Sequence, residues 1–448
     1  MAELAVLDQD ESTIPVYVID LSSPPSARYV NLARAYAPRI RALVDVFDDL
    51  LTDVGVPRTL HPLIKLAARL FLRNTSAREE TEEIRAIAKT AGVRLYLVVA
   101  FNLFLDLFMG CTSAVIKSLE NGEPLDRSRM LHLRTLDWSM DPLRSIIVRL
   151  DFIRSDSRTP DKVLGSSITY VGFVGVLTGV RKDLSMSLNF RGMHNATRRK
   201  ENFRFYLHHL FILLGRKQSI SSLLRDIMFA NLGTDRAPTL SEISKDLPPK
   251  RSTAAYLVFS DGNGALTMEK DFETAKVNES KSFVALTNHD LDSADESPAG
   301  MSSSPSRKDL TSFALVIEES VDRRRYLTQK WESKVIRARR KRRREELNGE
   351  WRRENNTTNH PASTQNLARR RSRRSLQNGG SSSRVGEPVS GRSSDVEETV
   401  SATRREIIAW ANGWPTTNEC THFAAVMDPK AGKILWSRRY LTPLDDEP

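Results

Sequence analysis

Cys111 is the residue of this 448-residue chain whose type and position best suit covalent chemistry. The apolar run from Leu95 to Phe108 leads to Gly110, to this cysteine, and then to two hydroxyl residues. A cysteine becomes a nucleophile when a neighbouring base takes its proton. A lone cysteine in apolar surroundings is more often a buried structural residue. The assignment of Cys111 therefore depends on what the rest of the chain places around it.

Further polar residues stand along the chain after Cys111. Arg134 and Asp137 are three residues apart, and Asn288 follows an apolar run. Each also has a structural interpretation. Arg134 and Asp137 could be an exposed charge pair, Asn288 could stabilise a turn, and Arg323 could be a solvated residue of the Asp-Arg-Arg-Arg run. The histidines have no metal-ligand spacing.

Composition restricts the class of protein. The hydrophobic content of 40% fits a globular chain, and much of the net charge of +11 lies between Arg323 and Arg405. Two cysteines exclude a disulfide framework. The first residues lack the basic and apolar regions of a secretory signal, so the compartment stays undecided. The apolar stretch from Tyr96 to Met109 is too short to span a bilayer comfortably.

The segment before Cys111 is expected to be mostly helical. A strand is predicted over 14–21, where apolar and polar residues alternate. Helices are predicted over 28–51, with a break or kink at Pro38, and over 60–71, 78–91 and 95–108.

The residues after Cys111 are rich in β-branched and aromatic side chains, which favours strands. Strands are predicted over 112–118, 130–138, 146–153, 166–177, 184–189 and 282–287, with hairpins over 254–269 and 421–440. Helices are predicted over 203–214, 220–229, 240–245 and 314–329, and a loop over 291–308.

The segment 334–400 is rich in Arg, Ser, Asn and Gly and poor in large apolar residues, so most of it should be disordered. Its basic part, 337–344, could form a helix. That run is typical of nuclear-localisation or nucleic-acid-binding tracts, and an anionic lipid surface is an equal alternative. A solvated loop is the interpretation that we favour, and we do not expect nucleic acid as a partner.

Several motifs together resemble acid ceramidase and N-acylethanolamine acid amidase, and more distantly penicillin V acylase and bile salt hydrolase. The motifs follow family order and include Ile14-Pro15-Val16-Tyr17, Cys111-Thr112-Ser113, Arg134 with Asp137, Tyr170-Val171-Gly172, Thr287-Asn288 and Asp322-Arg323. The resemblance covers residues from about Ile14 to Arg324, and the closing hairpin matches more weakly.

This resemblance implies an α+β fold, the αββα four-layer sandwich of N-terminal nucleophile hydrolases, preceded by a helical α-subunit region. Cleavage between Gly110 and Cys111 would give an α-subunit of residues 1–110 and a catalytic β-subunit that stay associated. The catalytic domain would comprise 111–333 and the closing strands 401–448, with 334–400 as a basic insertion.

The resemblance also implies the roles of the site residues. Cys111 would be the nucleophile, Arg134 would favour its thiolate, and Asp137 would hold its amine and sulfur. Asn288 would donate to the oxyanion, and Arg323 would complete the polar network. No metal or other cofactor is implied.

The implied reaction is hydrolysis of N-acyl lipids, ceramide before N-acylethanolamines, with a membrane-surface contact left open. One departure is that Phe190 in Asn189-Phe190-Arg191 replaces a family carboxylate. A catalytically impaired relative with a basic nucleic-acid- or lipid-binding tract is therefore the alternative.

Overall fold

The computed structural model describes residues 12–44, 48, 52, 57–104, 110–192, 194–195, 198–232, 236–291, 312–357 and 399–444. The chain divides into two compact units. The first comprises residues 1–330 and 401–448, and the second comprises residues 331–400. The long helix α10 (Ser312–Thr357) continues from the first unit into the second. Everything that concerns the candidate site lies in the first unit.

An eight-stranded sheet forms one half of the first unit. Its order is β1 (Val16–Asp20), β4 (Ile147–Ile153), β5 (Gly165–Tyr170), β6 (Thr178–Arg181), β7 (Leu184–Phe190), β8 (Ala255–Ser260), β9 (Ala265–Lys270) and β10 (Ala275–Ser280). The strands β1 and β4 are parallel, and every other pair of neighbouring strands in this sheet is antiparallel. The region before Cys111 therefore contributes an edge strand to this sheet as well as helices.

A five-stranded antiparallel sheet forms the other half and carries Cys111. Its order is β11 (Phe283–Leu286), β2 (Gly110–Ser118), β3 (Arg129–Asp137), β12 (Thr421–Asp428) and β13 (Lys433–Arg439). The register pairs Gly110 with Asp137 and Ser113 with Arg134. Thr421 pairs with Asp137 from the other side. Residues from three distant parts of the sequence thus meet at one end of the sheet.

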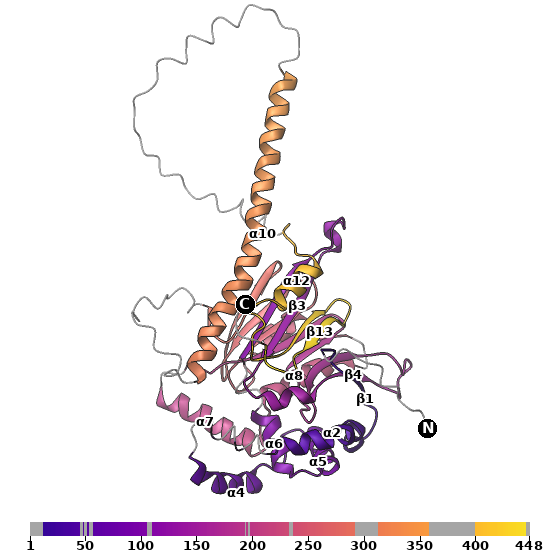
Figure 1. The fold of residues 1–448 in the computed structure, drawn as a ribbon, viewed down its shortest axis with the longest axis vertical. Helices are drawn as coiled ribbons and strands as arrows, with labels where there is room; N and C mark the ends of the chain where they lie inside the picture. Colours follow the sequence, from indigo (N-terminus) through magenta and orange to yellow (C-terminus); the bar gives the residue numbers. More distant parts are fainter. Residues whose placement is uncertain are drawn as a thin grey trace, which may run out of the picture. The chain divides into compact units, whose positions relative to one another are not determined.

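Helices cover the outer faces of both sheets, which makes four layers (Figure 1). The helices α8 (Ile220–Phe229) and α9 (Leu240–Asp246) contact strands of the large sheet, and α12 (Arg404–Ala411) packs on β3 and β12. A group from the first part of the chain packs together as α1 (Pro25–Arg28), α2 (Val30–Ala42), α4 (His61–Phe71), α5 (Arg78–Ala91) and α6 (Leu95–Phe104). The helix α7 is Arg199–Leu213. Short 3-10 turns complete the elements at Arg58–Leu60, Leu125–Arg127 and Asp141–Ile146. The αββα fold class is confirmed.

Polar side chains occupy part of the interface between the two sheets. On β7, Ser185, Ser187 and Asn189 alternate with leucine and methionine, so they share one face of the strand. Both ring nitrogens of His132 on β3 lie 2.9 Å from a hydroxyl, one from that of Ser185 and one from that of Ser187. Burial lowers the pKa of His132 to about 3, so its ring is neutral and belongs to the core.

Several predicted elements need correction. The strand expected over 166–177 ends at Tyr170 because the chain then turns through Gly172, whose φ of 101° is left-handed. Of the helix expected over 28–51, α2 covers Val30–Ala42 with Pro38 inside it, and 45–47 and 49–51 lie outside the described residues. The strand β10 was missed because it is a half-buried edge strand with few large apolar residues. The helix α12 was also missed, although Thr403 and Glu406 form its capping box.

The helix expected over 337–344 lies inside α10, which continues to Thr357, so 345–357 are helical where disorder was expected. Arg, Lys and Glu make up most of residues 334–357 and favour helix, and the first glycine after residue 334 is Gly349. Residues 358–398 and most of the loop expected over 291–308 lie outside the described residues, as do 105–108 at the end of the helix expected over 95–108.

Candidate active site

Cys111 is the second residue of β2, and its side chain is fully buried. Its backbone N–H donates to Oδ1 of Asn288 at 2.7 Å, which fixes the chain at the Gly110–Cys111 bond. Burial raises the pKa of the Cys111 thiol, while Arg134 acts in the opposite direction. In the uncleaved chain the sulfur is therefore a protonated thiol that solvent does not reach.

Arg134 contacts the sulfur directly. Its Nη2 donates to Sγ of Cys111 at 3.0 Å and to the carbonyl of Leu188 at 2.7 Å. Its Nη1 donates to Oδ1 of Asn189 and to the hydroxyl of Ser113, which lies 3.2 Å away. Because these acceptors lie on both sheets, the guanidinium is held rigidly. A fixed positive charge beside a sulfur favours the thiolate.

Asp137 lies at the end of β3, opposite Gly110. Its Oδ1 accepts a hydrogen bond of 2.7 Å from the hydroxyl of Thr421. Its Oδ2 forms no hydrogen bond with a described residue and lies 3.7 Å from Nε of Arg323. Burial raises the pKa of Asp137, and Arg323 opposes that shift. This carboxylate can therefore accept a proton at higher pH than an exposed aspartate can.

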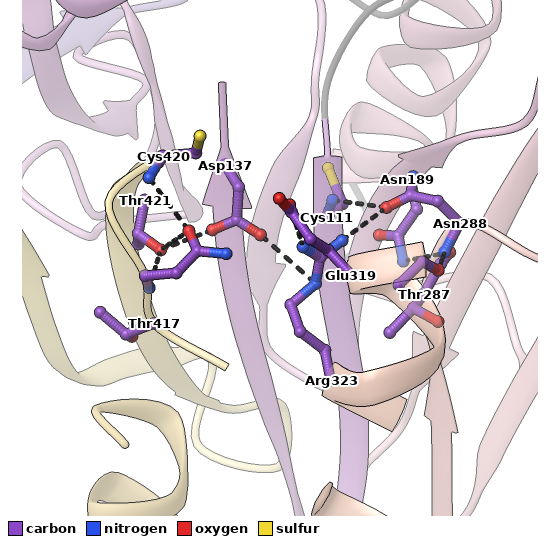
Figure 2. A network of polar contacts seen from close by, with 12 residues as sticks. Cys111, Asp137, Asn189, Thr287, Asn288, Glu319, Arg323, Thr417, Cys420 and Thr421 are labelled. Carbon is purple, nitrogen blue, oxygen red and sulfur yellow. Dashed lines mark hydrogen bonds and ion pairs between the residues drawn. The ribbon is translucent and has the colours of Figure 1, made fainter. Parts of the chain in front are cut away.

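Arg323 on α10 connects Asp137 to Asn288 (Figure 2). Its Nη2 donates to Oδ1 of Asn288 at 3.2 Å, the same oxygen that holds the Cys111 N–H. A Cβ built on Gly110 would lie 3.6 Å from this Nη2, so the guanidinium also borders the bond before Cys111. Arg323 is 1% exposed, which excludes the solvated interpretation of this residue.

The structure thus brings together all five residues predicted from the sequence, Cys111, Arg134, Asp137, Asn288 and Arg323. Asn288 accepts a hydrogen bond as well as donating one, whereas only a donor role was expected. Its Nδ2 donates to the backbone carbonyl of Phe190 at 2.8 Å, so one of its two amide hydrogens is engaged in the uncleaved chain. Phe190 therefore touches the site through its main chain.

Two further residues, Asn189 and Thr421, hold the candidate site residues in place and were not predicted from the sequence. Asn189 accepts from Arg134 and from Ser113, and its Nδ2 donates to the carbonyls of Leu286 and Thr287. Thr421 anchors Asp137 from the last hairpin. The alternation of Ser185, Ser187 and Asn189 on β7 was a usable signal for a polar interior face. Nothing in the sequence around Thr421 indicated its partner.

The described residues hold no group of three or more His, Cys, Asp or Glu side chains placed to bind a metal ion. The second cysteine, Cys420, is partly buried, and burial raises its pKa to about 12. Among the described residues no helix is both long and apolar enough to cross a membrane.

Comparison with known proteins finds similarity to N-acylethanolamine-hydrolyzing acid amidase and to acid ceramidases. A family model described as the beta subunit of N-acylethanolamine-hydrolyzing acid amidase matches residues 12–75, which lie before Cys111. Mouse acid ceramidase is 26% identical over 304 residues, covering 62% of this chain and 70% of that protein. Human acid ceramidase is 25% identical over 302 residues, with the same coverage.

Among solved structures, an N-acylethanolamine-hydrolyzing acid amidase ortholog from Caenorhabditis elegans matches 71% of this chain and 93% of its own. The two chains are 17% identical in sequence, and the TM-score of the match is 0.38.

A cysteine at the start of an inner strand of an αββα sandwich, with a buried arginine beside its sulfur, is the arrangement that the sequence resemblance predicted for an N-terminal nucleophile hydrolase. The chain is similar in sequence to acid ceramidases and, over residues 12–75, to the N-acylethanolamine-hydrolyzing acid amidase family model.

Proposed function

We propose that this protein is a cysteine amidohydrolase that cleaves its own Gly110–Cys111 bond and then hydrolyses N-acyl lipids. The observation that carries the proposal is the pair of contacts at Cys111. Nη2 of Arg134 lies 3.0 Å from the sulfur, and Oδ1 of Asn288 lies 2.7 Å from the backbone nitrogen. One contact favours the thiolate, and the other holds the nitrogen that would become the catalytic amine.

Self-cleavage is the first reaction that the geometry supports, because the buried sulfur can reach only its own chain. Sγ of Cys111 attacks the carbonyl carbon of Gly110, the peptide C–N bond breaks, and the thiol proton passes to the released α-amine. Water then hydrolyses the thioester and returns the thiol. Asp137 is the nearby carboxylate that accepts and returns the proton, and Arg323 borders the reacting carbonyl.

The mature enzyme would use the same atoms on a lipid amide. The α-amine of Cys111 takes the thiol proton, and the thiolate attacks the acyl carbon. The side-chain amide of Asn288 stabilises the developing oxyanion, an interaction worth about 3–4 kcal/mol. The amine product leaves with a proton, and water releases the fatty acid from the thioester.

The relatives point to the substrate class. The matched mammalian proteins are acid ceramidases, so ceramide is the first candidate and N-acylethanolamines are the second. An apolar face of α7 also supports a lipid partner, because Phe203, Tyr206 and Leu210 are exposed there at helical spacing. We propose that this face contacts a membrane surface or the acyl chain. The retained site residues disfavour a catalytically impaired relative.

Intact mass spectrometry of the purified protein tests the proposal. We expect fragments of residues 1–110 and 111–448, and an uncleaved chain for Cys111→Ala. Incubation with ceramide should then release fatty acid and form a transient acyl adduct on the larger fragment. Cys420→Ala is the matched control and should cleave normally. A wild-type chain that stays intact, or a Cys111→Ala chain that is still cut at this bond, would contradict self-cleavage.

A further inference from the structure

The second half of α10 carries a dense basic run. Eight of the eleven residues from Lys334 to Arg344 are lysine or arginine, and none is acidic. From Arg339 to Leu347 every side chain is exposed. A Cβ built on Gly349 would meet no atom within 4 Å. The described side chains of this part of the helix are therefore open to solvent.

Three large apolar side chains lie along one side of this basic helix. Ile336, Leu347 and Trp351 are 47%, 58% and 66% exposed. At about 100° per residue, these three positions fall within a sector of about 60°. Arg340 and Arg343 lie in or beside the same sector, and Arg337 and Arg344 flank it. We call these seven residues the Trp351 face.

Two basic residues outside the Trp351 face pair with acidic residues. Glu346 pairs with Arg342 at 3.2 Å, and Glu345 lies 4.0 Å from Lys341. The charge on that side of the helix is thus partly neutralised. Tryptophan, leucine and isoleucine flanked by arginine is the composition of a helix that lies in a lipid headgroup region.

We infer that the Trp351 face is a docking surface for an anionic phospholipid bilayer. The arginines would contact lipid phosphates, while Trp351, Leu347 and Ile336 would enter the boundary between headgroups and acyl chains. A nucleic-acid duplex fits the pattern less well. A groove binder would use basic residues all around the helix and would not need three exposed apolar side chains on one side.

Vesicle co-sedimentation of the full chain tests this inference. We expect binding to phosphatidylcholine vesicles that contain about 30 mol% phosphatidylserine, weakening with salt, and little binding to phosphatidylcholine alone. The double variant Arg340→Gln/Arg343→Gln should lower the partition coefficient by about 20-fold. Its matched control away from the Trp351 face, Lys341→Gln/Arg342→Gln, removes the same charge and should lower it by less than about threefold. Leu347→Ala/Trp351→Ala should weaken binding without changing its salt dependence.

Three results would overturn the inference. They are equal losses in the two charge variants, equal binding to neutral vesicles, and binding to a DNA duplex without binding to anionic vesicles. Helical circular dichroism of each variant excludes unfolding as the cause of a loss. None of the substituted residues touches the candidate active site, so vesicle binding and self-cleavage can fail independently.

Discussion

Oδ1 of Asn288 accepts hydrogen bonds from both the backbone nitrogen of Cys111, at 2.7 Å, and Nη2 of Arg323, at 3.2 Å. This one oxygen joins the nucleophile on β2 to the helix α10, which is more than 200 residues away along the chain. The contact orients the peptide nitrogen that self-cleavage would turn into an amine. Each of the following predictions tests one contact of this arrangement.

Replacing Asn288 by aspartate separates its two proposed roles. The new carboxylate would keep an oxygen that accepts from the Cys111 nitrogen but would lose the amide donor. If that donor stabilises the oxyanion of the lipid amide, we expect Asn288→Asp to slow acyl-enzyme formation on ceramide by about 100-fold, as Asn288→Ala should. Time-resolved intact mass measurement of the cleaved enzyme mixed with ceramide gives the rate. A near-normal rate in the aspartate variant would show that only the acceptor matters.

Arg134→Lys should slow self-cleavage by about 100-fold while keeping the positive charge. Lysine is a point charge and cannot reach the sulfur, Asn189 and Leu188 together as the planar guanidinium does. The control is Arg181→Lys, because Arg181 is also buried but bonds the carbonyls of Met228 and Ala230. That variant should lose stability and still cleave. Similar cleavage rates in the two variants would argue against a role for Arg134 at the sulfur.

Self-cleavage should decline on acidification before an ordinary aspartate would be protonated. Burial raises the pKa of Asp137 above its usual value of 3.8, so the ionised carboxylate is lost at a higher pH. We expect the rate to fall as pH drops through that raised pKa. Asp137→Asn should be slow at every pH and should lack this decline at low pH, which we call the acidic limb of the profile. A pH–rate profile that keeps the limb in the asparagine variant would assign it to another group.

Thr421→Val should alter the proton affinity of Asp137, although the valine side chain has nearly the same shape as threonine. The substitution removes the hydroxyl that donates to Oδ1 of Asp137 at 2.7 Å. A buried carboxylate oxygen without its donor costs about 1–3 kcal/mol, so Asp137 should bind a proton more readily. The acidic limb of the cleavage rate should move to higher pH, and Thr421→Ser should restore it. An unchanged limb in the valine variant would remove Thr421 from the site.

The two fragments should stay together without a covalent link. Both cysteines lie after Gly110, so no disulfide can join residues 1–110 to the remainder. Instead, Glu83 on α5 pairs with Arg225 on α8 at 2.6 Å in a buried contact, and Nδ2 of Asn102 donates to the carbonyl of Gly172 at 2.7 Å. Size-exclusion chromatography in 1 M NaCl should therefore show one species, since buried pairs are poorly screened.

Breaking the Glu83–Arg225 ion pair should weaken the association of the two fragments. Arg225→Met leaves Glu83 buried with one fewer counter-charge and should lower the free energy of unfolding by about 3–5 kcal/mol. The cleaved variant should release residues 1–110 in dilute solution. Arg78→Met is the control, because the Arg78–Glu82 pair is exposed and should contribute little. Fragment separation in the wild type would contradict this account.

The sequence by itself indicated the candidate nucleophile, the proposed cleavage point and most of the elements. Gly110-Cys111 follows an apolar run and begins a strand, and both signals are local. The strands around Cys111 and the closing hairpin were predicted because their β-branched residues and turn residues are adjacent in the chain. Local propensity also favoured helix in the basic tract, although composition led us to expect disorder over most of it.

Only the tertiary structure decided which residues surround the sulfur. Asn189 and Thr421 are placed by the pairing and stacking of strands from distant parts of the chain, which no local pattern encodes. The structure also decided that Arg134 and Asp137 are buried and not a surface pair. Both depend on how the two sheets face each other, because burial and mutual distance are properties of packing and not of sequence spacing.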